Sequence, residues 1–194
     1  MRLKLFKKYF FTNAVIILFS LTFMMMILAF VLNSYIAKSK QQTLDKARNE
    51  VIDYISSSNI NIKRDTDELY GILKTIAAVS DVNVFIGDNS GEVFLCGCEE
   101  WQQEKNCFHT ASKIETKEVK GYLDAVSDLH VGTLGIYETP HYLTLDSIID
   151  NEGKRQGIVF VTASVSEVGS LLSTVTQIYL LSAAVPLIIM FFAI

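Results

Sequence analysis

The chain has 194 residues, of which 50% are hydrophobic and 20% charged, and its formal net charge at pH 7 is −4. This length holds one or two small domains, and the apolar fraction is high for a soluble protein of that size. Beyond the first eight residues no charged side chain occurs before Lys38, and none follows Glu167. Two apolar ends therefore flank a polar middle, which excludes a simple cytoplasmic enzyme.

The polar middle is acidic. Residues 34–167 carry 13 basic against 21 acidic side chains, whereas residues 1–8 carry four basic side chains and no acidic one. A domain with such an excess of negative charge repels polyanions, so we expect no nucleic-acid partner.

The first apolar segment, residues 9–33, predicts a transmembrane helix. It is long enough to cross the roughly 30 Å hydrocarbon core of a bilayer. A cleaved signal peptide is the alternative, but its apolar core has only about 7 to 15 residues and ends at a small-residue cleavage motif that is not evident here. The basic tail at residues 1–8 places the N-terminus in the cytoplasm by the positive-inside rule. We therefore expect residues 34–170 outside the cytoplasm.

The second uncharged segment, residues 171–194, predicts a returning transmembrane helix with Pro186 inside it. A span that re-enters the cytoplasm is normally followed by Lys or Arg, and neither follows here. The sequence thus predicts a two-pass protein of the cell membrane whose cytoplasmic output is absent from these residues.

Two helices are expected at the start of the outer domain. Apolar residues recur at helical spacing after the first span, so the membrane helix is expected to continue outward over residues 34–56. Asp65, with Glu68 three residues later, is typical of a capping box that opens a second helix. The apolar residues of the first helix are Leu44, Ala47, Val51, Tyr54 and Ile55. Of these, we expect Leu44, Ala47, Val51 and Tyr54 to face a second copy of the chain. Those of the second helix are Leu69, Ile72, Leu73 and Ile76.

The period then changes to two, which predicts strands. Residues 82–86 and 92–96 flank a Gly- and Asp-containing turn and predict a first hairpin. Residues 142–149 and 156–163 flank the turn at 150–153 and predict a second hairpin. A short helix is expected at residues 117–127. Helices followed by an antiparallel sheet indicate an α+β domain of about 130 residues, enough for one core.

This layout resembles the sensor half of bacterial transmembrane sensor histidine kinases with a PAS-like external domain of the PDC or Cache type. The resemblance lies in the topology, in VNVFIGDNSGEVFLCG at residues 82–97 and in GKRQGIVFVTASVSEV at residues 153–168. It implies a homodimer, a small ligand or metal ion bound outside, and a cytoplasmic response regulator reached through the absent output. Chemotaxis receptors and membrane diguanylate cyclases share the layout. A membrane-anchored protein that binds or assembles other proteins is an alternative of another class.

No catalytic residue is expected in this chain. A phosphoacceptor histidine of the kinase family stands in a His-Glu-x-x-x-Pro context, whereas His109, His130 and His141 are followed by Thr, Val and Tyr. Phosphotransfer is thus implied only for a part of the protein outside these residues.

All three cysteines lie within twelve residues, as Cys-x-Cys, eight residues, and Cys-x-His. Cys96, Cys98, Cys107 and His109 together offer three thiolates and an imidazole, a tetrahedral set suited to zinc or another soft metal. Each x-spaced pair on extended chain would project to one face. Two other interpretations stay open: a disulfide from Cys107 to Cys96 or Cys98, which leaves one thiol over, or three inert thiols.

The surroundings of this cluster are strongly acidic and contain several aromatic residues. Residues 81–152 carry 14 acidic against 4 basic side chains, a charge that attracts cations, although a solvated acidic surface has the same composition. Four aromatic side chains could line an apolar pocket or belong to the core: Trp101, Tyr122, Tyr137 and Tyr142.

Overall fold

The computed structural model describes most of the chain and divides it into two compact units. The described residues are 2–58, 60–104, 107–110, 114, 120–121, 129–150, 152–165, 173–182, 184–185 and 188. One unit comprises Met1–Ala37 with Glu167–Ile194, and the other comprises Lys38–Ser166. Of the helix predicted at 117–127, all but residues 120–121 lies outside the described part.

Helix α1 (Arg2–Ser58) contains the first predicted span and its outward extension as one continuous helix. Within the described residues it is the one helix long and apolar enough to cross a membrane, and its most apolar window has a mean hydropathy of 2.9. The second predicted span, residues 171–194, is helical at 173–182, but much of it lies outside the described residues. A second spanning helix is therefore not established by the structure.

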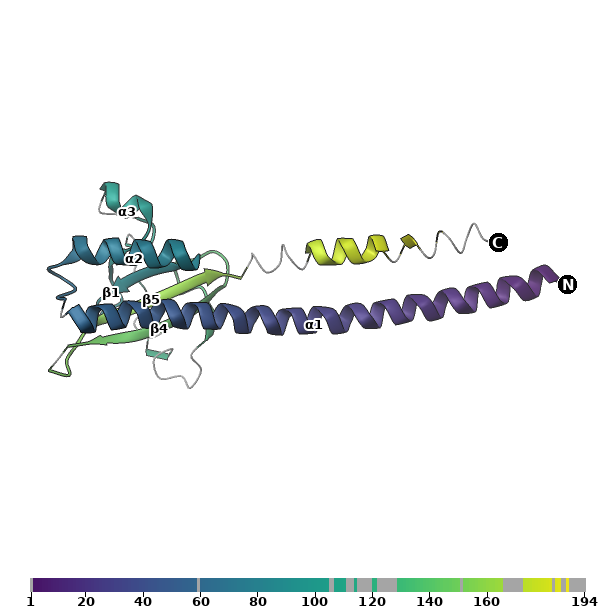
Figure 1. Cartoon of the computed structure of the whole chain (residues 1–194), viewed down its shortest axis with the longest axis horizontal. Coiled ribbons are helices and arrows are strands. Elements are labelled where there is room, and N and C mark those ends of the chain that lie inside the picture. The colour runs from purple at the N-terminus through teal and green to yellow at the C-terminus, as the bar shows by residue number, and fades with distance from the viewer. Residues whose placement is uncertain are drawn as a thin grey trace. The chain divides into compact units, whose positions relative to one another are not determined.

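The second unit is built on a five-stranded antiparallel sheet with the strand order β2-β1-β5-β4-β3 (Figure 1). The strands are β1 (Asn83–Gly87), β2 (Val93–Cys96), β3 (His130–Gly132), β4 (His141–Ile149) and β5 (Arg155–Ser164). Both predicted hairpins are confirmed, as β1 with β2 and as β4 with β5. Strand β3 and the pairing of β1 with β5 were not predicted.

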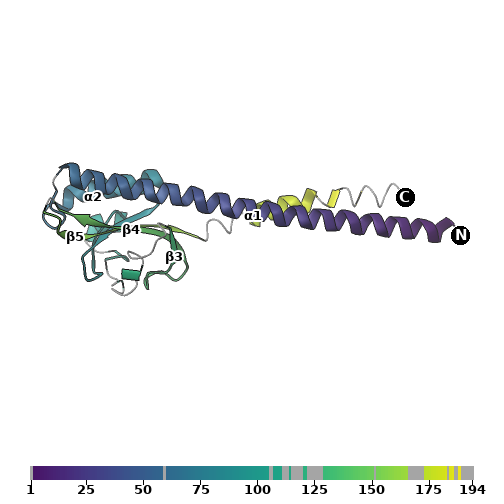
Figure 2. The ribbon, with the colours of Figure 1, turned by 90° about the horizontal axis from the view of Figure 1, so that it is seen from below.

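Helix α2 (Thr66–Ser80) and the last turns of α1 lie on one face of this sheet (Figure 2). In α1 the stripe of Leu44, Ala47 and Val51 is completely buried within this chain. Arg48 on the same helix donates a hydrogen bond to Thr144 of β4 at 2.9 Å. The stripe thus packs on its own sheet, and the prediction that it faces a second copy of the chain is wrong.

The second predicted helix exists, but the capping box that was expected to open it does not form. Asp65 stands at the N-cap position and makes no side-chain hydrogen bond to the first turn of α2. Its carboxylate instead accepts a hydrogen bond from the backbone N–H of Asn61 at 3.0 Å, within the loop that precedes the helix. The carboxylate of Asp65 therefore stabilises the loop before α2 and does not cap the helix.

Strand register assigns side chains to the two faces of the sheet. Cys96 of β2 is paired with Phe85 of β1, and Phe85 with Phe160 of β5, so these three residues form one cross-strand row. Thr162 lies two residues after Phe160 and therefore shares its face. Thr144 pairs with Val161, and both side chains point to the opposite face. On that face Arg48 of α1 donates its hydrogen bond to Thr144. The row that contains Cys96 accordingly lies on the face away from α1.

Candidate metal centre

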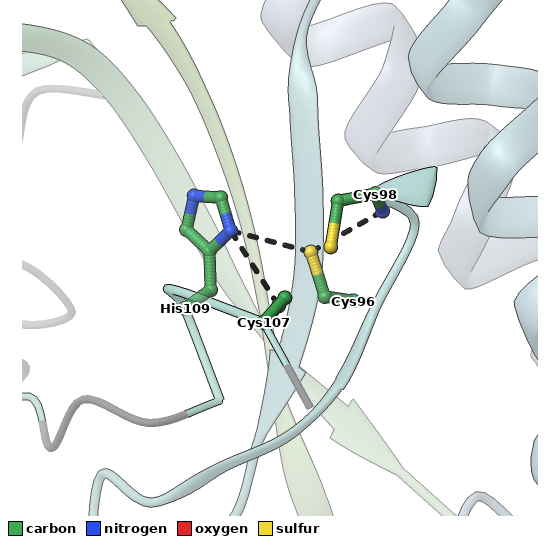
Figure 3. Close-up of side chains that lie close together, drawn as sticks. All are labelled: Cys96, Cys98, Cys107 and His109. Carbon is green, nitrogen blue, oxygen red and sulfur yellow. Dashed lines mark hydrogen bonds between the residues drawn. The ribbon is translucent and has the colours of Figure 1, made fainter. Parts of the chain in front are cut away.

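The structure brings together all four residues of the predicted metal site. Cys96 ends β2, and Cys98 follows in the bend before α3 (Glu99–Glu104). Cys107 and His109 belong to a short turn at residues 107–110. The four possible ligand atoms, three Sγ and one imidazole nitrogen, lie within 4.8 Å of one another. Figure 3 shows the thiols and the imidazole pointing toward a common centre.

The local conformation of the second pair differs from the expectation. Cys107-x-His109 was expected on extended chain, but these residues form a turn. The hydroxyl of Thr110 stabilises this turn, because it accepts a hydrogen bond from the backbone N–H of Cys107 at 2.7 Å and donates one to the Cys107 carbonyl at 3.1 Å. The turn brings the side chains of Cys107 and His109 to the same side, as an extended chain would. It depends on the hydrogen bonds of the Thr110 side chain, which the sequence spacing alone does not reveal.

The imidazole of His109 is fixed on three sides. Its Nδ1 lies 3.3 Å from Sγ of Cys96 and 3.9 Å from Sγ of Cys107. Its ring stacks on Phe85 at a centroid distance of 4.9 Å, which ties it to the middle of the sheet. Its Nε2 lies 2.9 Å from the hydroxyl of Tyr137. The side that faces the thiols is therefore the Nδ1 side.

The hydrogen bonds continue from His109 into the central strand. The Tyr137 hydroxyl is 2.8 Å from Oγ1 of Thr162 on β5. The Tyr137 ring also stacks on His141 at the start of β4, with centroids 3.8 Å apart. A continuous set of polar contacts thus links the imidazole to β5.

In the metal-free site, burial is the largest influence on the pKa values of the three thiols and the imidazole. Burial, followed by the neighbouring Cys98, raises the pKa of the Cys96 thiol, and burial likewise raises that of Cys98 to about 11. For Cys107 burial also acts to raise the pKa, but hydrogen bonds from Cys98 and Thr110 outweigh it and the pKa is lowered. Burial lowers the pKa of His109 to about 4, so its imidazole is neutral at physiological pH.

The chemistry of these four side chains is that of soft-metal ligands. None of the three cysteines is in a disulfide. Zn²⁺ takes Cys sulfur and neutral His nitrogen in tetrahedral sites, and a Cys₃His set fills all four positions. Such a closed set suits binding or structural roles more than catalysis, because catalytic zinc keeps one position open.

Sequence reasoning missed two residues of this arrangement. Tyr137 was considered only as a pocket or core aromatic, and Thr162 was not considered, because 28 and 53 positions separate them from His109 and only the fold brings them near. Of the other aromatics, Trp101 stacks on Tyr70 at 4.9 Å and Tyr142 is buried in β4. Tyr122 lies outside the described residues.

Comparisons with known proteins address the fold. No protein-family model matches the sequence, and a search of curated proteins found no match either. Among solved structures, the ligand-binding domain of the Campylobacter jejuni chemoreceptor Tlp3 in complex with L-norvaline matches with a TM-score of 0.55 and 17% identity, over 76% of this chain and 59% of that chain. The same receptor domain with L-valine matches with a TM-score of 0.50 and 13% identity, over 87% and 65%.

A looser match is the sensor domain of the V. cholerae histidine kinase DctB, with a TM-score of 0.40 and 11% identity, over 70% of this chain and 58% of that one. The chain spans about three fifths of the chemoreceptor domain that it matches with the TM-score of 0.55. At these identities the likeness establishes the fold. The α+β prediction is thus confirmed: the chain has a fold found in the ligand-binding domain of a chemoreceptor.

Proposed function

We propose that this chain is the signal-input part of a transmembrane receptor, with residues 34–170 as an extracytoplasmic sensor domain. The observation that carries the proposal is the five-stranded sheet preceded by a long helix, which matches the ligand-binding domain of a chemoreceptor with a TM-score of 0.55. The fold places one thiol-rich cluster on the face of the sheet away from α1. The signal in this proposal is a ligand, a metal ion or a redox state that acts at this cluster.

The membrane attachment in this proposal uses two spans. Support for the first is the length and hydropathy of α1. Support for the second comes from the smaller unit, where residues 173–182 are helical and the Tyr179 hydroxyl donates a hydrogen bond to the backbone carbonyl of Leu21 in α1. In a bilayer such a contact satisfies a hydroxyl that would otherwise be buried in hydrocarbon without a partner.

For the output we propose a histidine kinase that works as a homodimer with a cytoplasmic response regulator. Support for this output is the resemblance of the sequence layout to sensor kinases. A chemotaxis receptor is the second candidate, because the two structures described above with TM-scores of 0.55 and 0.50 are domains of a chemoreceptor. The protein sequence after Ile194 distinguishes the two, since a kinase requires a phosphoacceptor histidine and an ATP-binding domain there.

Topology tests the proposal directly. Alkaline phosphatase, which is active only outside the cytoplasm, is fused to the chain after Lys40 in one fusion and after Ile194 in another. Fluorescent-protein fusions at the same two positions serve as the reciprocal reporter. We expect phosphatase activity at Lys40 and cytoplasmic fluorescence at Ile194. Cytoplasmic fluorescence at Lys40 would refute an extracytoplasmic sensor domain.

A further inference from the structure

We infer that Cys96, Cys98, Cys107 and His109 bind one thiophilic divalent metal ion, Zn²⁺ in particular, through three sulfurs and Nδ1 of His109. This inference deepens the proposed function and rests on it for its biological meaning, because it names the metal ion as the species recognised by the sensor domain. Metal binding itself can be measured whether or not the domain signals.

The spacing of the ligand atoms fits a tetrahedral metal. With Zn–S near 2.3 Å and Zn–N near 2.0 Å, two ligands of a tetrahedron are separated by about 3.5 to 3.8 Å. Nδ1 of His109 lies 3.3 Å from one sulfur and 3.9 Å from another, on either side of that range. All four atoms lie within 4.8 Å of one another. Closing to full coordination thus requires adjustments of about 1 Å or less.

The orientation of His109 favours a metal over a disulfide. A disulfide consumes two sulfurs and gives no role to an imidazole nitrogen that faces two sulfurs. A metal uses that nitrogen, and a metal-binding histidine almost always donates its other ring N–H to a hydrogen-bond partner that fixes the ring. Tyr137 supplies this partner at 2.9 Å from Nε2. Tyr137 is therefore a positioning residue: with Nε2–H directed at its hydroxyl, the lone pair of Nδ1 is directed at the thiols.

Three of the four ligands are buried and the fourth is partly exposed. Cys96 is only 1% exposed and His109 8%, whereas Cys98 is partly exposed. A hollow of about 180 Å³ is lined by Cys96, Gly97 and Cys98 together with Lys74 and Glu99. Cys98 is the ligand most exposed to solvent.

Hydrogen bonds connect the metal ligand His109 to the central strand of the sheet, so metal binding can affect the rest of the domain. They run from His109 through Tyr137 to Thr162 on the central strand β5. That strand ends at Ser164, a few residues before the apolar segment 171–194. A change in the position of His109 on metal binding thus acts on the strand that leads to the membrane.

The test uses the full 194-residue chain in detergent, kept reduced with a phosphine and titrated with Co²⁺ alone. We expect a single cobalt ion per chain, with thiolate-to-cobalt charge-transfer bands in the near ultraviolet and intense visible bands typical of a tetrahedral centre. Zn²⁺ should displace it, because thiolate ligands favour zinc. His109→Ala and Cys98→Ser should each change the cobalt spectrum and weaken binding. His130→Ala, a histidine of β3 outside the cluster, is the matched control and should bind as the parent does.

Tyr137→Phe separates positioning from folding. It keeps the ring that stacks on His141 and removes only the hydroxyl, so the circular dichroism should change little. The metal-free melting temperature should fall, because the buried Thr162 hydroxyl and Nε2 of His109 lose a hydrogen-bond partner. The affinity for Co²⁺ should fall about 10- to 100-fold, as expected when a metal-binding histidine loses the hydrogen-bond partner of its other ring nitrogen. Circular dichroism of every variant identifies any that fails to fold, and Cys98→Ser, at a partly exposed position, then stands in for His109→Ala.

Three results would overturn the inference. One is absence of cobalt binding by the reduced chain with all three thiols titratable. Another is isolation, without reductant, of a metal-free chain with one free thiol, which means that two of the three cysteines form a disulfide. The third is a cobalt spectrum that is the same in folded His109→Ala or Cys98→Ser as in the parent. None of these depends on the topology reporters, so the metal site and the receptor assignment can fail separately.

Discussion

Asp88 shows how one carboxylate holds the turn between β1 and β2. Its Oδ1 accepts hydrogen bonds from the backbone N–H and the hydroxyl of Ser90, at 2.8 and 2.7 Å, and from the N–H of Glu92 at 3.1 Å. Partial burial acts to raise the pKa of Asp88, but the hydrogen bonds from Ser90 and Glu92 outweigh it and lower the pKa below its usual value. The ionised form is therefore the one that stabilises the fold.

We predict that Asp88→Ala lowers the free energy of unfolding by about 1 to 3 kcal/mol at neutral pH. Because the pKa is lower in the folded state, this contribution is complete above the unfolded-state pKa of about 3.9 and is lost as the pH falls through the folded-state pKa. Denaturant titrations at several pH values measure the difference from the parent. The exposed Asp53→Ala is the control, with an expected effect within about 0.5 kcal/mol. A difference between parent and Asp88→Ala that stays constant down to about pH 3 would contradict this account.

Gly97, between Cys96 and Cys98, is a position where the fold has no room for a side chain. A Cβ there would lie 2.7 Å from the backbone carbon and oxygen of Leu73 in α2. Since helix backbone cannot yield as a flexible side chain does, we predict that Gly97→Ala costs about 1 to 3 kcal/mol of stability. It should also weaken Co²⁺ binding, because the shift separates the two cysteines on either side.

The matched control for this prediction is Gly71→Ala. No heavy atom lies within 4 Å of a Cβ at Gly71, which is in α2. Since alanine is the better helix former by up to about 1 kcal/mol, this variant should be more stable than the parent in the same denaturant titration. Equal changes in stability for the two substitutions would show that the contact with the Leu73 backbone is not the cause of the loss in Gly97→Ala.

The candidate site illustrates what sequence can and cannot give at the level of residues. The four ligands lie within fourteen positions, and spacing with ligand type was enough to name them. Spacing could not show the turn held by Thr110, nor the side of the imidazole that faces the thiols. Those details depend on Phe85 and Tyr137, which only the folded chain brings to His109.

At the level of elements, the sequence pattern predicted the helices and hairpins that depend on nearby residues, and it missed the pairing of distant strands. The two hairpins and the helices α1 and α2 follow from alternation, from helical spacing and from turn residues within a few positions of one another. The short helix α3, of six residues, was not predicted. Strand β3 has three residues, too few for a periodic signal, and the pairing of β1 with β5 joins residues more than seventy positions apart. The wrong assignment of the α1 stripe has the same cause, because an apolar stripe does not specify whether it packs on its own sheet or on another chain.

The contact between α1 and β4 can be tested through Arg48. Its side chain is only 14% exposed, lies 3.5 Å from Asp45 and donates to the buried hydroxyl of Thr144 at 2.9 Å. Arg48→Ala leaves that hydroxyl without its donor, so we predict a loss of about 1 to 3 kcal/mol in the free energy of unfolding. Denaturant titration followed by circular dichroism measures it.

The control for Arg48 is the neighbouring Lys46. Lys46 and Glu50 form an exposed ion pair at 3.8 Å on the same helix. Exposed pairs of this kind contribute little, so Lys46→Ala should change stability by less than about 1 kcal/mol. If both substitutions cost the same, the helix as a whole, and not the contact with β4, accounts for the effect.

For the whole molecule, the metal site joins parts of the sensor domain that are distant along the chain. Cys96 belongs to the sheet, Cys107 and His109 to a turn that packs over it, and Tyr137 to the segment before β4. An unfolded chain cannot hold these groups together, so metal affinity is coupled to folding. The whole domain should therefore respond to metal, and not only the loop that carries the cysteines.

We predict that Zn²⁺ raises the melting temperature of the reduced 194-residue chain and that a chelator reverses the increase. At a free concentration of about 100 times the dissociation constant, binding to the folded state alone contributes about 2.7 kcal/mol. For a unit of this size that energy corresponds to an increase of roughly 5 to 20 °C. Melting of the sheet, followed by circular dichroism with and without zinc, measures the shift. In His109→Ala the shift should be much smaller, while His130→Ala should keep it in full. An equal shift in His109→Ala would mean that zinc stabilises the chain through some other group, such as the acidic surface.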